Sequence, residues 1–348
     1  MTHVLVARMD SDGDVLLAGP AVRAVAASGA RVTLLCGPRG RAAAELLPGV
    51  DDVLCHHCPW IDAHPEPVTR EATEALVADV AARGVDEAFV LTSFHQSPLP
   101  LALLLRLAGV PRIAAVSVDY PGSLLDVRHR LPEEGLHEVE RALSLVATLG
   151  YALPPGDDGG LAVREVAGDA PAPDGPFVAV HPGASVPARS WAPGRWAELV
   201  SSLADEGRRV VVTGAPGETG LTARVAGRAR PEVVDLGGRT SLAGLAEVLA
   251  AADALVVGNT GPAHLAAAVG TPVVSLFAPT VPAERWRPWG VPLALLHVDV
   301  PCADCRARAC PVPGHPCLEG VATRDVLEAV ERLAPLRARE RVRVGAPA

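Results

Sequence analysis

The sequence predicts an α/β protein built from two doubly wound, Rossmann-like domains that face a central cleft. Short β-branched runs alternate with alanine- and leucine-rich segments of helical length, and this alternation occurs twice along the chain. A segment dense in proline, glycine and aspartate separates the two series. The chain has 348 residues, which is long enough for two domains that each bury their own core.

The expected strands are apolar without a two-residue alternation, which is typical of buried parallel strands. In the first half they are residues 3–7, 31–36, 87–91 and 112–118, and helical segments follow them. The second half repeats the plan, with strands expected at 177–182, 208–214, 232–237, 254–259 and 272–279.

Residues 153–176 have the composition of a domain linker. We therefore expect an N-terminal domain at residues 1–160 and a C-terminal domain at residues 170–348. Doubly wound domains bind ligands at the carboxyl ends of their strands. The cleft between the two domains is the expected active site.

Composition excludes several classes of function. A formal net charge of -9 argues against nucleic acid as a partner, because a basic surface supplies most of such binding. The first residues have neither the basic region nor the cleavage site of a secretory leader. No apolar run approaches the roughly 18 residues of a membrane span. We expect a cytoplasmic protein.

Asp10, Asp12 and Asp14 alternate after the first expected strand. A calcium loop would need glycine at its sixth position and glutamate at its twelfth, where this chain has Val15 and Ala21, so that interpretation fails. Asp14 is expected at a strand-to-helix corner facing the cleft, where its carboxylate could take a proton from a substrate hydroxyl. The alternative is a cap or first-turn aspartate that satisfies free backbone N–H groups. Asp10 and Asp12 are expected to be solvated or substrate-facing.

Two segments of the second half suggest a phosphate site. Gly183-Ala184-Ser185 follows a strand and precedes Arg189, so the turn could offer N–H donors and a fixed positive charge to a diphosphate, although an ordinary loop is an equal alternative. The sharper motif runs from Asn259 through Thr260 and Gly261 to His264, between a strand and an apolar helix. Its N–H and hydroxyl groups would lie at the positive end of that helix.

Two common nucleotide motifs are absent from the sequence. No G-x-G-x-x-G follows the first strand, which gives poor support to a dinucleotide site. All 31 basic residues are arginine, so a P-loop with its lysine is excluded.

The order of "GDVLLAGPAVRAV", "HPGAS…RSW", "VVVTGAPGE", "VVDLGGRTSLAGLAEVLAAAD" and "NTGPAHLAAAVGTPVVSLFAPT" resembles glycosyltransferase family 9, the ADP-heptose heptosyltransferases, which have the GT-B fold. The similarity covers roughly residues 3–335 and is strongest after residue 177. It implies an inverting, metal-independent glycosyltransferase without a cofactor, with an acceptor-binding first domain and a donor-binding second domain. The expected partners are an ADP-heptose-like nucleotide sugar and a glycan or glycolipid, and contact with a membrane surface is compatible with the latter.

Residue roles follow from the resemblance where residues match. Asp14 matches the proposed catalytic base. Arg189 takes a position, usually lysine, that contacts the donor diphosphate. Four further residues match positions near the phosphates and sugar of the donor, namely Ser185, Thr260, Gly261 and His264. Glu218 matches a position near the ribose, and Thr240 one beside the adenine.

Asn259 departs from the family pattern, which has aspartate there to engage the hydroxyls of the donor sugar. An amide keeps the hydrogen bonding but loses the charge. The alternative function is therefore a non-catalytic protein that binds a sugar nucleotide, and a nicotinamide-dependent oxidoreductase is disfavoured by the missing glycine motif. For the acceptor, His95, Asp119, Arg128 and His129 are candidates, each with a solvated loop residue as the alternative.

Seven cysteines include Cys302, Cys305, Cys310 and Cys317, with His315 between the last two. Such a set could satisfy a tetrahedral zinc ion, while free thiols or disulfides are the alternatives. A weaker cluster, "CHHC", occupies residues 55–58.

Overall fold

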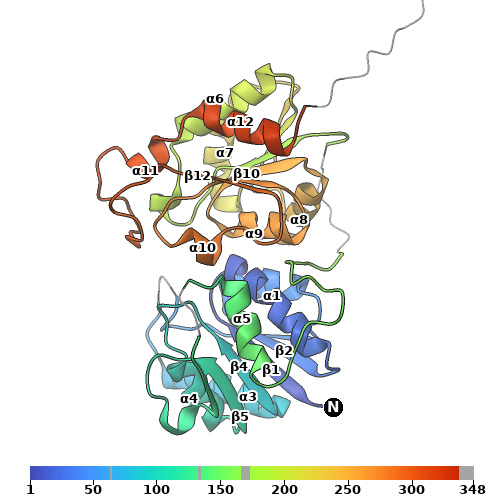
Figure 1. The fold of residues 1–348 in the computed structure, drawn as a ribbon, viewed down its shortest axis with the longest axis vertical. Coiled ribbons are helices and arrows are strands. Elements are labelled where there is room, and N and C mark those ends of the chain that lie inside the picture. Colours follow the sequence, from blue (N-terminus) through green and yellow to red (C-terminus); the bar gives the residue numbers. More distant parts are fainter. Residues whose placement is uncertain (63–64, 132–134, 166–172, 337–348) are drawn as a thin grey trace, which may run out of the picture.

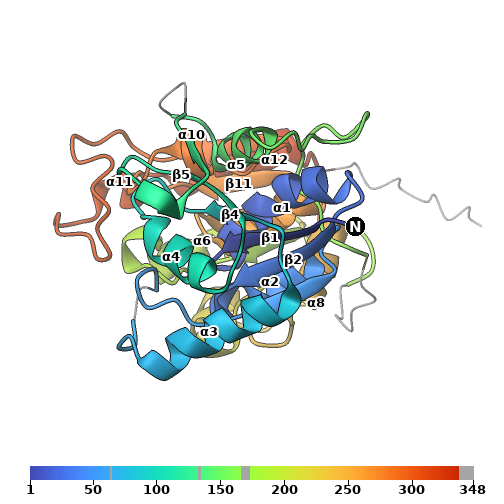
Figure 2. The same ribbon diagram turned by 90° about the horizontal axis from the view of Figure 1, so that it is seen from below.

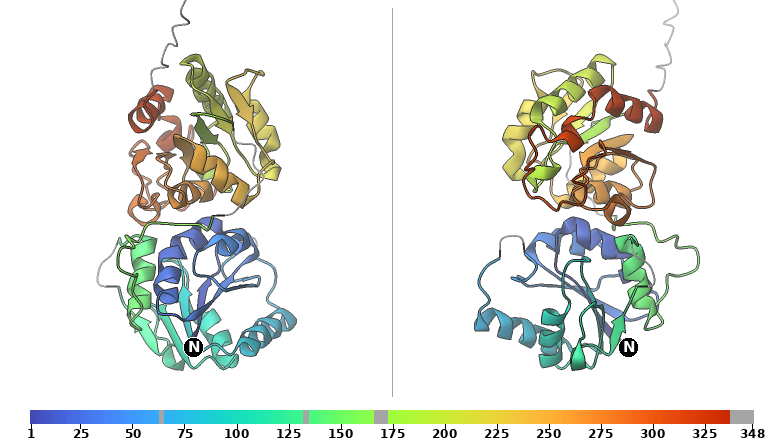
Figure 3. Two further views of the ribbon diagram at one scale, coloured as in Figure 1. Left: turned by 90° about the vertical axis from the view of Figure 1, so that its right-hand side faces the viewer. Right: turned by 60° about the vertical axis from the view of Figure 1, so that its left-hand side comes forward.

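The structure is a computed structural model that describes residues 1–62, 65–131, 135–165 and 173–336. These residues form two α/β halves stacked one above the other, each around a parallel sheet (Figure 1). Figure 3 shows the same two-lobed arrangement from two further sides. The predicted fold class is confirmed.

The first sheet has the strand order β3-β2-β1-β4-β5-β6. Its strands are β1 (His3–Arg8), β2 (Arg31–Cys36), β3 (Asp52–Cys55), β4 (Glu87–Leu91), β5 (Arg112–Val116) and β6 (Val127–His129). Its helices are α1 (Asp12–Ala26), α2 (Arg41–Leu46), α3 (Arg70–Arg83), α4 (Leu99–Leu107) and α5 (Glu138–Ala147), with short 3₁₀ turns η1 (Pro38–Gly40) and η2 (Gly122–Leu124).

The second sheet has the order β12-β11-β10-β7-β8-β9, so the same topology is used twice. Its strands are β7 (Val178–His181), β8 (Val210–Val212), β9 (Val233–Asp235), β10 (Ala254–Gly258), β11 (Val273–Leu276) and β12 (Leu293–Leu296). Its helices are α6 (Pro193–Asp205), α7 (Thr219–Ala226), α8 (Leu242–Ala251), α9 (Gly261–Ala268), α10 (Ala283–Trp286), α11 (Pro316–Glu319) and α12 (Thr323–Leu333), with turns η3 (Pro187–Arg189) and η4 (Pro216–Glu218).

Strands buried on both faces explain the continuous apolar runs. In β1, Val4 and Val6 belong to the core beneath α1 and α5, whereas Leu5 and Ala7 belong to the core beneath α3 and α4. Figure 2 shows the helices on both sides of the first sheet. Because each strand order reverses between β1 and β4, and between β7 and β10, each half has one switch point at its carboxyl edge, where doubly wound folds bind ligands.

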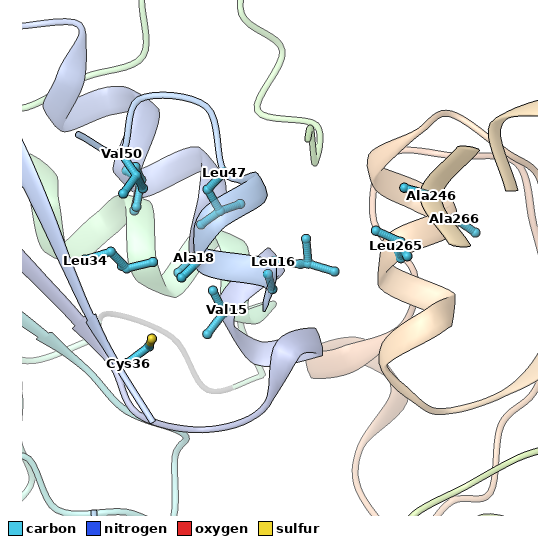
Figure 4. Close-up of a cluster of buried hydrophobic side chains, with 14 of the residues drawn as sticks. Val15, Leu16, Ala18, Leu34, Cys36, Leu47, Val50, Ala246, Leu265 and Ala266 are labelled. Atoms are coloured by element: carbon cyan, nitrogen blue, oxygen red, sulfur yellow. The ribbon is translucent and has the colours of Figure 1, made fainter. Parts of the chain in front are cut away.

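The two halves share apolar contacts. One buried cluster includes Leu16 and Leu47 from the first half and Ala246 and Leu265 from the second (Figure 4). Helix α1 contacts α9, and α2 contacts α8. The halves are therefore packed directly against each other on the side of these helices.

The expected linker is partly pinned to both halves. Arg23 makes a bidentate ion pair with Asp157, and the indole N–H of Trp289 donates to the Gly159 carbonyl oxygen at 3.0 Å. Residues 166–172 of the linker lie outside the described residues. The domain boundaries at 1–160 and 170–348 stay a prediction.

The second half contains a buried pair of tryptophans that should dominate its stability. Trp191 and Trp196 are 2% and 1% exposed, with ring centroids 5.3 Å apart in an edge-to-face arrangement. We expect Trp196→Ala to lower the free energy of unfolding of this half by about 3–5 kcal/mol, because the truncation leaves a large cavity. Urea denaturation followed by circular dichroism would measure it. Leu107→Ala, at a side chain that is 64% exposed, is the control and should change stability by less than about 0.5 kcal/mol.

Candidate active site

The amino ends of α1 and α9 meet at two glycines. A Cβ atom placed on Gly13 would lie 3.1 Å from the Gly261 Cα and 3.1 Å from the His264 Cδ2. A side chain at this position would require the helices to move apart slightly, so glycine favours their close approach. Asp14 follows one residue later, so the first turn of α1 points its carboxylate toward the start of α9.

A cavity of about 260 Å³ opens at this junction. The first half lines it with Met9, Asp10, Ser11, Gly13, Asp14, Arg39, Ile61, Asp62, Ser93, His95 and Gln96, and the second with Arg189, Asn259, Thr260, Gly261, His264, Val281 and Trp286. Six of the nine predicted catalytic and donor-binding residues thus share one cavity, which lies between the two switch points.

Asp14 does not act as a helix cap. The cap position of α1 is Ser11, whose hydroxyl donates to Asp14 Oδ2 at 2.9 Å, while Asp14 Oδ1 accepts from Arg8 Nη2 at 2.9 Å. Burial alone would raise the pKa of Asp14, but Arg8, the Ser11 hydroxyl and His264 together hold it below its usual range. Asp14 is therefore an ionised carboxylate at neutral pH.

Asp10 is not the solvated residue that was one of its two expected states, and its substrate-facing alternative stays a prediction. Its side chain is only 11% exposed, pairs with Arg8 Nε at 3.0 Å and accepts from Gln96 Nε2 at 2.5 Å. It still lines the cavity. Asp12 instead turns toward α2, where its Oδ1 accepts from the Ala43 N–H at 3.1 Å.

Arg189 and His264 supply the second half of the site. Arg189 lies in η3, and its Nε donates to the Thr280 hydroxyl at 3.3 Å. Burial lowers the pKa of Arg189 somewhat, and the guanidinium remains charged. Burial lowers the pKa of His264 to about 4, so its imidazole is neutral, and within the described residues its Nδ1 has no hydrogen-bond partner.

Three predicted donor residues lie at the same edge of the sheet but outside the cavity lining. Ser185 is exposed in the turn after β7, and Thr240 directly precedes Ser241, the residue that caps α8. Glu218 accepts from the Ala215 N–H at 2.8 Å and lies against Gly183, where an added Cβ would be 2.2 Å from its Oε1. The three residues follow the carboxyl ends of β7, β8 and β9 in turn.

Of the acceptor candidates, the structure brings His95 into the cavity and leaves the other three out of its lining. Asp119 is exposed, Arg128 donates to the Ser117 and Val118 carbonyl oxygens, and His129 Nε2 bonds the Ser144 hydroxyl at 2.7 Å. Burial lowers the pKa of His95, with Arg306 adding to the effect.

Several cavity residues were missed by the sequence analysis, namely Arg39, Asp62 and Trp286. Arg8 was missed as well, although a charged residue at the end of an otherwise apolar strand was a usable signal. Trp286 lies 5.5 Å from Phe94, whose ring is also covered by Arg285 and Arg306 at 4.7 and 4.3 Å. These contacts form a second junction between the halves.

The cysteines are free thiols in this structure. Cys302, Cys305, Cys310 and Cys317 line a separate cavity of about 30 Å³ beside Ala188 and Thr280. Among residues 1–62, 65–131, 135–165 and 173–336, no group of three or more histidine, cysteine or acidic side chains is placed to hold a metal ion. In the weaker cluster at residues 55–58, His56 pairs with Asp79, and Cys58 is buried.

The described part of the chain contains no helix with the length and apolar character needed to cross a membrane.

Comparisons with known proteins agree with the two-sheet fold. The model for glycosyltransferase family 9 (heptosyltransferase) matches residues 90–315. Lipopolysaccharide heptosyltransferase 1 of Pseudomonas aeruginosa is 37% identical over 179 residues, or 51% of this chain and 49% of the relative. Lipopolysaccharide heptosyltransferase 1 of Escherichia coli K12 is 34% identical over 149 residues, or 42% and 46% of the two chains. The chain thus spans about half the length of the curated relatives it matches.

Solved structures show the same fold over nearly the whole chain. The glycosyl transferase family 9 structure from Veillonella parvula has a TM-score of 0.79 at 16% identity and covers 96% of this chain and 97% of its own. An E. coli heptosyltransferase solved with ADP-2-deoxy-2-fluoro heptose has a TM-score of 0.72 at 24% identity, with coverages of 95% and 99%. The fold is GT-B, and this chain belongs to glycosyltransferase family 9.

Proposed function

We propose that this protein transfers heptose, or a similar sugar, from an ADP-linked donor to a hydroxyl of a glycan, glycolipid or metabolite, with inversion at the anomeric carbon. The observation that carries the proposal is one cavity that joins the Asp14 carboxylate from the first half to Arg189 and the amino end of α9 from the second. The curated relatives that match are heptosyltransferases, which supports heptose as the sugar.

The proposed reaction is a single displacement. The acceptor hydroxyl gives its proton to Asp14 while its oxygen attacks the anomeric carbon, and the bond from that carbon to the diphosphate breaks with its electron pair on the leaving oxygen. Arg189 and the free N–H groups at the start of α9 stabilise the charge that develops on the departing ADP. No step assigned to these residues uses a metal ion or a cofactor.

The proton-accepting role suits the surroundings of Asp14. The carboxylate is ionised at neutral pH because Arg8 and Ser11 bind it, and its side chain is 22% exposed. His264 is neutral beside it, so it can offer a hydrogen bond without adding a second positive charge that would weaken the base.

Asn259 is the proposed contact to the donor sugar. Its Nδ2 donates to the Ala278 carbonyl oxygen at 3.3 Å, and its buried Oδ1 has no hydrogen-bond partner in the described residues. A buried acceptor without a partner is costly, so a sugar hydroxyl that donates to it would bind favourably. This geometry keeps the hydrogen bond that an aspartate would make and removes its charge.

The remaining assignments extend along the two sheet edges. Ser185, Glu218 and Thr240 are proposed to hold the phosphate, ribose and adenine of the donor, because they follow successive strands leading away from Thr260 and Gly261. On the acceptor side, the cavity offers His95, Gln96, Arg39 and Trp286, a set that suits a polyhydroxylated glycan. We further propose residues 1–160 as the acceptor domain and 170–348 as the donor domain, and a cytoplasmic location.

A thermal-shift panel tests the donor class. All nucleotides are compared at one concentration, about 100 times the dissociation constant of ADP. At this concentration we expect ADP and ADP-heptose to stabilise the protein by about 2.7 kcal/mol, and UDP, GDP and their sugar derivatives to stabilise it much less. Equal response to all nucleotides, or none to ADP compounds, would contradict the ADP-linked donor. Stabilisation by ADP-heptose without sugar transfer to any member of a panel of glycan, glycolipid and small-molecule acceptors would favour the non-catalytic alternative.

A further inference from the structure

Arg8 is surrounded by more negative charge than it can balance. The guanidinium is 4% exposed and pairs with Asp10 at 3.0 Å, Asp14 at 2.9 Å and Glu138 at 3.1 Å. We call these four residues the Arg8 cluster. Arg141 also interacts electrostatically with Glu138, and Arg189 with Asp14, whereas the cation that acts on Asp10 is the shared Arg8. A buried carboxyl that shares its cation in this way is favoured to take up a proton.

Geometry and electrostatics together favour Asp10 as the carboxyl that takes up that proton. Glu138 is 2% exposed and lies outside the lining of the interdomain cavity. Asp14 has two bonds that favour its charged form, from Arg8 and Ser11, and Asp10 has one amide donor, Gln96, beside its contact with Arg8. Burial raises the pKa of Asp10 to about 6; Arg8 and Gln96 oppose the rise, and the charges of Asp14 and Glu138 add to it. Asp10 also lines the cavity, so it can exchange a proton with the solvent there.

We infer that Asp10 is a positioning residue for the transfer reaction, which sets the basicity of Asp14 through the guanidinium that the two carboxylates share. The inference rests on the proposed role of Asp14 as the base. When Asp10 is ionised, it competes for Arg8 and repels the charge on Asp14, so Asp14 accepts a proton more readily. When Asp10 is neutral, Arg8 pairs more fully with Asp14, which becomes a weaker base.

Asp10 takes no proton from the substrate in this scheme. The acceptor proton moves to Asp14 during the displacement and leaves for solvent afterwards, while Asp10 stays at equilibrium with the solvent. At neutral pH Asp10 is ionised and the base is at its strongest. As the pH falls through about 6, Asp10 becomes neutral and the rate falls to a lower plateau, before Asp14 itself is protonated at lower pH.

Several other titratable groups lie near Asp10. Burial raises the pKa of Cys58 to about 12, so its thiol stays neutral. His95 and His264 have pKa values lowered by burial, and both are neutral near pH 7. Arg8 stays charged and pairs with Glu138, while Arg141 and Arg189 interact electrostatically with Glu138 and Asp14. The cavity adds Arg39 and Asp62.

Carbon-13 NMR of the full chain, labelled at the aspartate carboxyl carbons, tests the coupling without any substrate. Asp14→Asn and Asp10→Asn assign the two signals. In the unaltered protein, we expect the Asp14 signal to show an inflection near pH 6 that mirrors the titration of Asp10. Asp10→Asn should remove that inflection, and Asp12→Asn, at a carboxylate bonded to Ala43 instead, should keep it. An assigned Asp14 signal without an inflection near pH 6 would overturn the inference.

The pH dependence of transfer from ADP-heptose to a lipopolysaccharide core acceptor gives the second test. We expect kcat/KM of the unaltered protein to fall by about threefold to tenfold as the pH is lowered through about 6, and Asp10→Asn to show the lower value across this range. ADP affinity should stay the same. If kcat/KM of Asp10→Asn still fell as the pH was lowered through about 6, the inference about Asp10 would be overturned and the proposed base would stand. Full transfer by Asp14→Asn would instead overturn the proposed base and leave the NMR result unaffected.

Discussion

Asp14→Asn is expected to lower kcat/KM for sugar transfer by about 10²–10⁴, with little change in ADP affinity. The amide occupies the same space, its oxygen can still accept from Arg8, and its NH2 group can donate to the Ser11 hydroxyl oxygen, but it cannot take the acceptor proton. The loss should therefore appear in the chemical step. Initial rates of ADP release from ADP-heptose, together with calorimetric titration of ADP, measure the two quantities.

Asp12→Asn is the matched control for this change. Asp12 lies two residues earlier in the same helical turn, but it bonds the Ala43 N–H and does not line the cavity. It should retain transfer within about a factor of three. If Asp14→Asn kept the rate of the unaltered protein, Asp14 would not be the base.

Arg189→Met should have the second largest effect, lowering kcat/KM by about 10²–10³. The guanidinium is the cation that the second half contributes to the cavity lining, and the methionine side chain keeps the stem while removing the charge. We expect both weaker ADP binding and slower transfer, because the charge on the diphosphate grows as the sugar leaves.

Arg189→Lys distinguishes charge from packing at this position. A lysine ammonium keeps the positive charge but loses the planar donor geometry that reaches Thr280. We expect kcat/KM of Arg189→Lys to be at least about tenfold higher than that of Arg189→Met. Equal defects in both variants would mean that Arg189 acts by holding η3 in place, without contacting the diphosphate.

The sequence was sufficient to predict the two-domain fold and the helix-start motif of the second half. Residues 254–268 form a continuous unit of strand, turn and helix, and Pro262 lies in the first turn of α9. These predictions depend only on patterns among residues that are close together in the sequence. Strands β3, β6 and β12 were missed because they are short and largely half-buried, so that no apolar run marks them.

The Arg8 cluster could not be predicted in the same way. Glu138 is 130 residues from Arg8 in sequence, and only the packing of α5 beside α1 brings them to 3.1 Å. Arg39 and Trp286 likewise reach the cavity through the arrangement of two halves. Local reasoning on Asp14 alone left a cap as an alternative, because helix starts are rich in acidic residues, whereas in the structure Ser11 occupies the cap position.

A crystal structure of the protein with ADP-2-deoxy-2-fluoro heptose would test the central proposal most directly. We predict that the β-phosphate lies at the amino end of α9 within hydrogen-bond distance of Arg189, and that the anomeric carbon faces the Asp14 carboxylate with room for one acceptor oxygen between them. A diphosphate bound away from α9, or a sugar whose anomeric carbon points away from Asp14, would contradict it.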